Sequence, residues 1–353
     1  MYFSDIVNAA LSNENDRPLM QKEIYPLSDS FQKYLEKYGR DIELPISYPE
    51  LFHYSHTNSI KDKNGKPTHW ENVIYEGKLF DKLAPKLISA YELLYPDEAK
   101  TSLEIRAIDF CEYANSMPFR VTISFKNNNP DKIFYIKSAD ASRVYGIELE
   151  QLISPNKVVF FYHQQTLVEA HIEGIPGDIF LGKAMEISTK ERLQLAKEFV
   201  KFNERCFTRL LGDMRSYNFV VTKNIGDADA GFRIRAIDFD QQSYEGRANL
   251  YLPQFYKENF DYVQLVNELI SKREIEEIRI QERRSLAKLV VENDHRLMEL
   301  FDVMVREELS ENYKILSLRK ELNNIFSTHR YSFCKTMGSI VKEHLKQILQ
   351  VSL

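Results

Sequence analysis

The stretch "LLGDMRSYNFVV", residues 210–221, connects what reads as the end of a long helix to the start of a strand. Gly212 and Asp213 stand at the head of this connection, Asn218 follows, and an apolar run comes next. Short connections between regular elements often carry functional side chains, because the elements hold the connection in place. The segments on either side therefore decide what this carboxylate and this carboxamide can do.

Residues 188–210 predict a long amphipathic helix that leads directly into this connection. Ser188 and Glu191 have the spacing of a capping box at its start. Apolar side chains recur along one face at four-three-four spacing, at Leu195, Phe199, Phe202 and Cys206. Downstream, two apolar runs joined by a polar loop at 222–231 predict a hairpin, and residues 253–351 read as helical throughout.

The region from about residue 103 to 173 has a different character, with runs rich in β-branched and aromatic residues. These runs predict five strands, at 103–113, 119–125, 132–139, 157–165 and 166–174. Turn residues separate the first three, which favours an antiparallel meander, and a helix is expected over 140–153. The predicted fold class is therefore α+β, with a sheet region before a mainly helical region.

Composition narrows the classes of function. The chain has 353 residues, 43% of them hydrophobic, and a formal net charge of -5, which indicates a globular protein and gives no support to nucleic-acid or anionic-membrane binding. Three scattered cysteines without C-x-x-C spacing indicate neither a zinc site nor a disulfide framework. No run is long and apolar enough to span a bilayer, and we expect a cytoplasmic protein.

Three side chains at strand ends or on the connecting loop predict a metal-dependent site: Asp213, Asn218 and Asp238. Their oxygens are the hard donors that suit Mg²⁺, which takes few protein ligands and completes its octahedron with water and phosphate oxygens. A nucleoside triphosphate would supply those phosphates. In phosphoryl transfer the protein mainly orients the reactants and neutralises charge, so the set favours an enzyme that uses ATP and Mg²⁺.

The motif "GDMRSYN" resembles the catalytic loop of the protein-kinase-like superfamily, especially its aminoglycoside and choline phosphotransferase branch. The segment "RAIDFDQQ" is similar to the metal-binding segment on the hairpin that follows this loop, with Ile237 before Asp238. The resemblance implies that Asp213 is the catalytic base and that Asn218 and Asp238 hold the metal. Arg215, inside the loop, is expected to contact either a phosphate or substrate, or a local acid.

Upstream segments match the same superfamily in order. "IFYIKSA", residues 133–139, is similar to its third-strand lysine segment, which implies that Lys137 binds the nucleotide phosphates. The acidic partner of this lysine is expected on the next helix, where Glu148 lies within the apolar stripe and Glu150 does not, so Glu148 is preferred. "VEAHIEGIPG" resembles the strand and hinge that bind adenine, with Glu169 to Glu173 near the nucleotide edge.

The resemblance implies a bilobal protein-kinase-like fold with an N-terminal extension. The expected boundaries are an extension of mixed helix and loop at 1–100, an N-lobe with a five-stranded antiparallel sheet and one helix at 101–174, and a helical C-lobe at 175–353. The C-terminal helices are expected to shape the acceptor pocket and to offer a surface for a protein partner. The acceptor itself is a hydroxyl of a small molecule or, as the second choice, of a protein.

Departures from the superfamily pattern keep a second hypothesis open. The segment "CEYANSMP", residues 111–118, has no glycine where a glycine-rich phosphate loop is expected, and Leu211 stands where many relatives have histidine. Asp240 adds a carboxylate two residues after Asp238, either as another metal contact or as a solvated charge. The alternative function is accordingly a pseudokinase-like binding or scaffold module without catalytic turnover.

Overall fold

The computed structural model describes residues 22–62, 64–97, 102–126, 130–183, 187–223 and 231–353. Most of the loop predicted at 222–231 lies outside these residues. The chain divides into two compact units. The sheet unit comprises Pro26–Asp140 and Val158–His171, and the helical unit comprises Ala141–Lys157 and Ile172–Leu353 together with residues 22–25. Each unit is described by itself.

The sheet unit is built on a seven-stranded antiparallel sheet of order β1-β2-β3-β4-β5-β7-β6. Its elements are α2 (Asp29–Lys37), β1 (His56–Lys61), β2 (Pro67–Ile74), α3 (Lys78–Leu94), β3 (Leu103–Phe110), β4 (Phe119–Phe125), β5 (Lys132–Ser138), β6 (Phe160–His163) and β7 (Thr166–Ala170). Helix α3 buries Leu87 and Tyr91 in the same apolar cluster as Phe119 and Phe134 of the sheet. The core of this unit therefore lies between α3 and the sheet.

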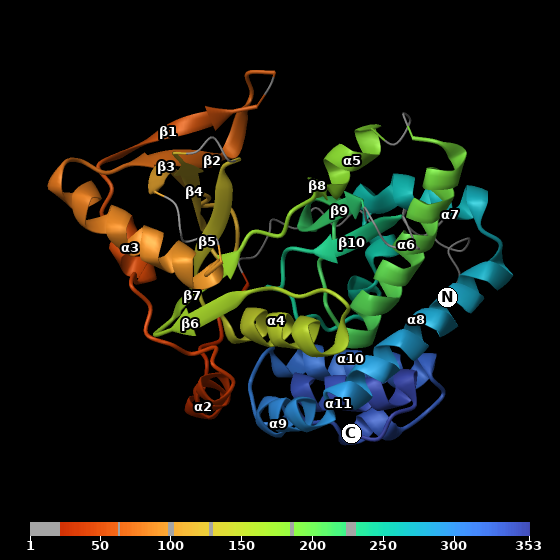
Figure 1. The fold of residues 1–353 in the computed structure, drawn as a ribbon. Coiled ribbons are helices and arrows are strands. Elements are labelled where there is room, and N and C mark those ends of the chain that lie inside the picture. Colours follow the sequence, from red (N-terminus) through yellow and green to blue (C-terminus); the bar gives the residue numbers. More distant parts are fainter. Residues whose placement is uncertain (1–21, 63, 98–101, 127–129, 184–186, 224–230) are drawn as a thin grey trace. The chain divides into compact units, whose positions relative to one another are not determined.

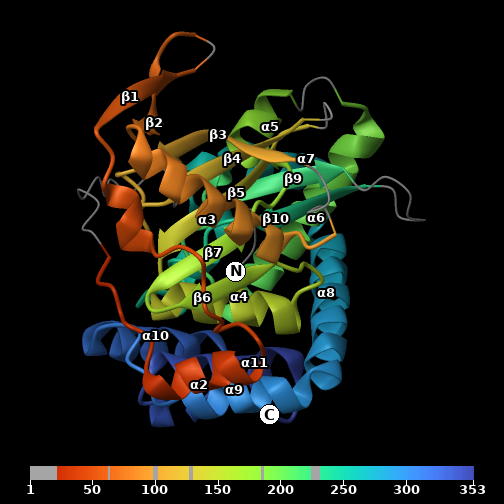
Figure 2. The ribbon, with the colours of Figure 1, turned by 60° about the vertical axis from the view of Figure 1, so that its left-hand side comes forward.

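The five strands expected from the sequence are all present, as β3 to β7, but the sheet has two further strands. Strand β2 pairs with β3 through Glu71↔Phe110 and Asn72↔Asp109, and the β1–β2 hairpin reaches beyond the other strands (Figure 2). Both strands are largely exposed and polar, so they lack the apolar alternation by which strands are recognised. The expectation of a separate extension at 1–100 is therefore wrong for the described residues from 26 onward.

The helical unit carries a small three-stranded sheet of order β10-β9-β8 beside a group of helices. Its elements are α4 (Ala141–Ile153), β8 (Ile175–Pro176), α5 (Gly177–Lys183), α6 (Thr189–Arg209), β9 (Phe219–Lys223), β10 (Phe232–Ala236), α7 (Phe260–Leu269), α8 (Lys272–Glu292), α9 (Asp294–Met304), α10 (Asn312–Ile325) and α11 (Met337–Leu349). Short 3₁₀ turns include η4 (Ser216–Asn218) and η8 (Arg330–Phe333). This confirms the predicted α+β order, with the hairpin at β9–β10 and helices after it.

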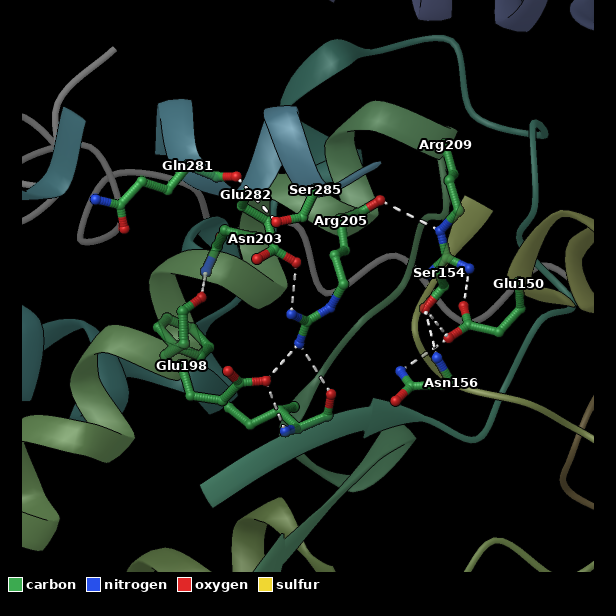
Figure 3. Close-up of polar contacts among 12 residues, drawn as sticks. Glu150, Ser154, Asn156, Glu198, Asn203, Arg205, Arg209, Gln281, Glu282 and Ser285 are labelled. Atoms are coloured by element: carbon green, nitrogen blue, oxygen red, sulfur yellow. Dashed lines mark hydrogen bonds and ion pairs between the residues drawn. The ribbon is translucent and has the colours of Figure 1, made fainter. Parts of the chain in front are cut away.

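Helix α6 is the central helix of this unit and contacts α7, α8, α11 and β10. Its predicted capping box is present, since Ser188 and Glu191 each accept the other's backbone N–H. The predicted apolar stripe is buried. The flank beside this stripe is buried too: Arg205 donates to Glu198 at 2.6 Å and to Glu282 of α8 at 2.9 Å (Figure 3).

This buried ion-pair cluster ties three elements together. Glu198 also accepts the backbone N–H of Ile234 on β10, at 3.1 Å, and Arg205 donates to the carbonyl of the same residue. Burial lowers the pKa of Arg205, but Glu198 and Glu282 outweigh it and hold the pKa above its ordinary value. The guanidinium is therefore a permanent cation within the packing of α6, α8 and β10.

Helix α4 lies in the helical unit, which corrects the prediction that a helix over 140–153 belongs with the sheet. All of its residues are buried, and it contacts α8 and α9. Gly146 permits a close approach to the segment after β10, since a Cβ there would lie 3.0 Å from the Cβ atoms of Phe239 and Gln242. That prediction rested on the apolar stripe of this helix. Such a stripe indicates that one face of the helix is buried, but not which of the two units that face packs against.

Candidate functional site

The loop that carries Asp213 is held in place by the segment that follows the β9–β10 hairpin. Helix α6 ends at Leu210 in the left-handed conformation, and Ser243 donates its backbone N–H to the carbonyl of Leu210 at 2.9 Å. Gly212 donates to Gln241 at 3.2 Å. The loop and the metal-binding segment predicted after β10 are thus fastened to each other through their backbones.

Asp213 lies at the centre of a polar cluster. Its backbone is left-handed, with φ 54°, a conformation that aspartate tolerates better than most residues. Arg215 donates through Nε to Asp213 Oδ1 at 2.7 Å and through Nη1 to Glu258 at 2.7 Å. Burial raises the pKa of the Asp213 carboxyl, and this effect outweighs the opposing effect of Arg215. The expected contact of Arg215 with a local acid is therefore present.

Asn218 is brought beside Asp213 by the 3₁₀ turn η4. Its Nδ2 donates to the backbone carbonyl of Asp213 at 2.7 Å and lies 3.3 Å from Asp213 Oδ2. This contact uses the amide nitrogen, which leaves the side-chain oxygen Oδ1 as the atom of Asn218 that can serve as a ligand.

Asp238 is placed next to Asn218 by the register of the hairpin. Ala236 pairs with Phe219, and Ile237 donates its backbone N–H to the carbonyl of Asn218 at 3.0 Å. The charges of this region act together on the phenol of Tyr217. Its pKa is raised, first by burial, with the charges of Asp213, Glu258 and Asp238 adding to the effect and Arg215 opposing it. The structure therefore gathers Asp213, Asn218 and Asp238 in one region of the helical unit.

Sequence reasoning missed Arg143, which binds both carboxylates of the "DFD" segment. From the first turn of α4, its Nη1 donates to Asp238 Oδ1 at 3.0 Å and to Asp240 Oδ1 at 2.6 Å. The side chain of Arg143 is 1% exposed and that of Asp240 is 6% exposed, so Asp240 is not the solvated charge that was one expectation for it. Two features of the sequence could have indicated this contact: an arginine beside the apolar stripe of α4, and a second aspartate, Asp240, whose role was left open.

Lys137, in the sheet unit, is buried rather than exposed. Its Nζ lies 2.7 Å from Glu169 Oε2, and the two side chains are 8% and 6% exposed. The register places Lys137 on β5 opposite Leu167 on β7, with Glu169 two residues further along β7. Glu169 is therefore an acidic partner of this lysine, one that a search of the following helix alone does not find.

Both acidic candidates on α4 have guanidinium partners. Glu148 lies 2.6 Å from Arg296 of α9. Glu150 pairs with Arg209 of α6 and accepts from Ser154 at 2.7 Å and from Asn156 (Figure 3). Burial lowers the pKa of Arg209 to about 9. The pairing of Lys137 with Glu148 stays a prediction.

Glu173 is exposed on the segment that leads into β8. The next residue, Gly174, has φ +153°, and a Cβ there would lie 2.7 Å from the Cβ of Val220. The backbone thus approaches β9 so closely that only glycine fits. Glu173 lies exposed next to this glycine, and its role near the nucleotide stays a prediction.

The described residues contain no group of three or more His, Cys, Asp or Glu side chains able to hold a metal ion. A cation at Asn218 and Asp238 would therefore depend on oxygens supplied by a bound phosphate. None of the described helices has the length and apolar character that crossing a membrane requires. The chain matches no protein-family model and no curated protein.

Proposed function

We propose that this chain is an ATP- and Mg²⁺-dependent phosphotransferase with a protein-kinase-like bilobal fold, acting on a hydroxyl of a small molecule or, as the second choice, of a protein. The observation that supports it most is the shared location of three side chains on one loop and hairpin. Asp213 is a carboxylate suited to accept a hydroxyl proton, and Asn218 and Asp238 offer oxygen ligands.

The donor set fits Mg²⁺ bound together with nucleotide phosphates. Mg²⁺ is commonly held by one or two protein ligands while phosphates and water complete its shell. Asn218 Oδ1 and the Asp238 carboxylate meet that need. Held by these two residues, the ion would neutralise charge that develops on the transferred phosphoryl group. Arg143 already neutralises part of the charge of the Asp238–Asp240 pair, so a requirement for a single ion fits this site better than a requirement for two.

The chain's own residues would orient the acceptor hydroxyl and bind the nucleotide phosphates. Asp213 would accept a hydrogen bond from the acceptor hydroxyl and orient it, while Arg215, braced by Glu258, holds the carboxylate in one rotamer. Burial, which raises the pKa of Asp213, makes its carboxylate a stronger base. Lys137, held by Glu169, would bind the α and β phosphates.

A specific observation favours a second candidate, a nucleotide-binding scaffold without turnover. Arg143 binds the proposed metal ligand Asp238 directly, and Arg215 binds the proposed base. The cation on Asp238 reduces its readiness to bind a metal, and Arg215 opposes the effect by which burial raises the pKa of Asp213. In that case the site would bind the nucleotide weakly, or would bind it without transferring a phosphoryl group.

Thermal unfolding with ATP and Mg²⁺ tests nucleotide binding. At about 100 times the dissociation constant, ligand binding contributes roughly 2.7 kcal/mol, which raises the Tm by about 4 °C for a chain of this size. We expect this shift in the wild-type chain and its loss in Asp238→Ala. Asp302→Ala, an exposed aspartate on α9, is the matched control and should keep the shift.

Turnover of radiolabelled ATP then separates the two candidates. Asp213→Ala is expected to retain the thermal shift and to lose at least about 100-fold in turnover, since general-base groups contribute on the order of 10²–10⁴. A wild-type shift without turnover in the presence of hydroxyl acceptors would favour the scaffold. If ATP and Mg²⁺ do not raise the Tm of the wild-type chain, both the phosphotransferase and the nucleotide-binding scaffold are contradicted.

A further inference from the structure

Two open hollows flank the 3₁₀ turn η8 in the helical unit. The first, of about 590 Å³, lies between η8 and the face of α10 that carries Leu316, Arg319 and Asn323. The second, of about 570 Å³, lies between η8 and the face of α11 that carries Lys342 and Lys346. His329 lines both hollows, so they form one surface, here named the η8 surface.

The η8 surface is basic although the chain is acidic. Residues 312–353 contain seven lysines and arginines and two glutamates, whereas the whole chain has a net charge of -5. Among the residues that the structure describes, no acidic one lines the first hollow. The second has Glu343, which lies 3.8 Å from Arg330. Within the described residues, Lys320 and Lys346 form no ion pair, so their charges are available to a ligand.

An exposed apolar side chain lines the second hollow. Phe333, at the end of η8, is 83% exposed, and within the described residues its ring stacks on no other aromatic ring. Val305 and Cys334 add apolar surface to the second hollow. Phe333 and Arg330 line the same hollow, and aromatic residues and arginine are enriched at protein interfaces.

We propose that the η8 surface binds an acidic peptide segment that carries a large apolar side chain. The lysines and arginines would pair with carboxylates of the segment, and its apolar side chain would pack on Phe333. In the first hollow Asn323 donates to the hydroxyl of Ser332 at 2.9 Å, and the amide of Asn324, which also lines this hollow, can hydrogen-bond to peptide groups. A concave, hydrogen-bonding surface suits a peptide better than a bilayer, and one exposed aromatic ring is a poor platform for stacked bases.

Selection of a displayed library of random twelve-residue peptides against the full chain tests this proposal. We expect enrichment of sequences in which several Asp or Glu residues flank Leu, Phe or Trp. Enriched peptides, labelled with fluorescein, should bind in fluorescence anisotropy with an affinity that weakens as salt rises. Lys320→Glu combined with Lys346→Glu should raise the Kd at least tenfold, and Phe333→Ser should raise it several-fold.

The matched control is Arg284→Glu combined with Lys288→Glu, which makes the same change of charge on exposed positions of α8 and should leave the Kd unchanged. Asp213→Ala should also leave it unchanged, because this surface does not depend on phosphotransfer. Circular dichroism confirms that each variant is folded. The proposal is overturned by a library without acidic enrichment, or by equal effects of the two charge reversals. It is also overturned if oligouridylate or phosphatidylserine vesicles bind through Lys320 and Lys346 while the peptides do not.

Discussion

The guanidinium of Arg143 holds Asp238 and Asp240 at 3.0 and 2.6 Å, in a setting where the arginine and Asp240 are almost fully buried. Two carboxylates two residues apart would repel each other in such a place unless a cation lay between them. Arg143 supplies that cation from α4. At the scale of the single residue, the candidate site therefore depends on an arginine as much as on its three oxygen-bearing side chains.

Replacing Arg143 by alanine should lower the free energy of unfolding by about 3–5 kcal/mol, the usual cost of removing one partner from a buried ion pair. Because two carboxylates then lack this counter-ion, millimolar Mg²⁺ or Ca²⁺ should raise the Tm of the variant more than that of the wild-type chain. Differential scanning fluorimetry without nucleotide measures both effects. Arg143→Lys keeps the positive charge, so divalent cations should raise its Tm less than that of Arg143→Ala. If Mg²⁺ and Ca²⁺ leave the Tm of Arg143→Ala unchanged, this interpretation is contradicted.

At the scale of the element, α11 is joined to α6 by a buried histidine. His344 Nε2 lies 3.0 Å from the carbonyl of Phe207, which fixes Nε2 as the donor, and its Nδ1 accepts from the hydroxyl of Tyr331 at 2.9 Å. Burial lowers the pKa of His344 to about 3, and the nearby charge of Arg283 acts in the same direction. The imidazole is therefore neutral in the folded chain.

This histidine makes the helical unit sensitive to acid. In the unfolded chain His344 takes up a proton near pH 6.5, whereas in the folded chain it does so only near pH 3. Its contribution to stability is complete above pH 6.5 and is lost as the pH falls toward 3, at up to about 1.4 kcal/mol per pH unit. Between pH 6.5 and 5, the wild-type chain should lose about 2 kcal/mol more than His344→Gln.

Urea unfolding followed by circular dichroism at 222 nm measures this difference, because helices dominate the signal. His344→Gln will differ from the wild-type chain in absolute stability, since its packing changes. The comparison therefore concerns how steeply each stability curve falls with pH. Parallel curves for the two proteins would show that His344 takes up its proton at the same pH in the folded and unfolded chains, and would contradict this prediction.

At the scale of the whole molecule, the proposed function requires residues from both units to bind one nucleotide. Lys137 belongs to the sheet unit, and Asp213, Asn218 and Asp238 belong to the helical unit. The chain passes between the units at residues 25–26, 140–141, 157–158 and 171–172. A ligand bound by both units would therefore stabilise segments that are distant in sequence.

Hydrogen exchange with and without ATP and Mg²⁺ tests this requirement. We expect slower exchange in residues 132–138 of β5 and, in the same experiment, in residues 213–218 and 237–240. Lys137→Met should reduce the protection in both units, because each would bind the nucleotide less well alone. If protection were confined to one unit, the bilobal nucleotide site would be wrong even where ATP binds.

Local patterns predicted the regular elements because those elements depend on local chemistry. The capping box at Ser188 starts α6 where expected, and the five strands rich in branched and aromatic residues all form. The candidate loop was found for the same reason, since Asp213 and Asn218 are five residues apart. The pairing of Glu169 with Lys137 and the role of Arg143 were missed because the paired residues lie 32 and 95 or more positions apart.

The amino-acid sequence by itself determined the α+β order, the position of α6, and the loop and hairpin that bring Asn218 beside Asp238. Only the tertiary structure decided that the polar strands β1 and β2 extend the sheet, that α4 packs among α8 and α9, and that Arg143 and Arg205 are buried among carboxylates. The physical reason is that periodicity and capping act within a few residues of one another. The burial of an ion pair, by contrast, depends on which distant segment supplies the opposite charge.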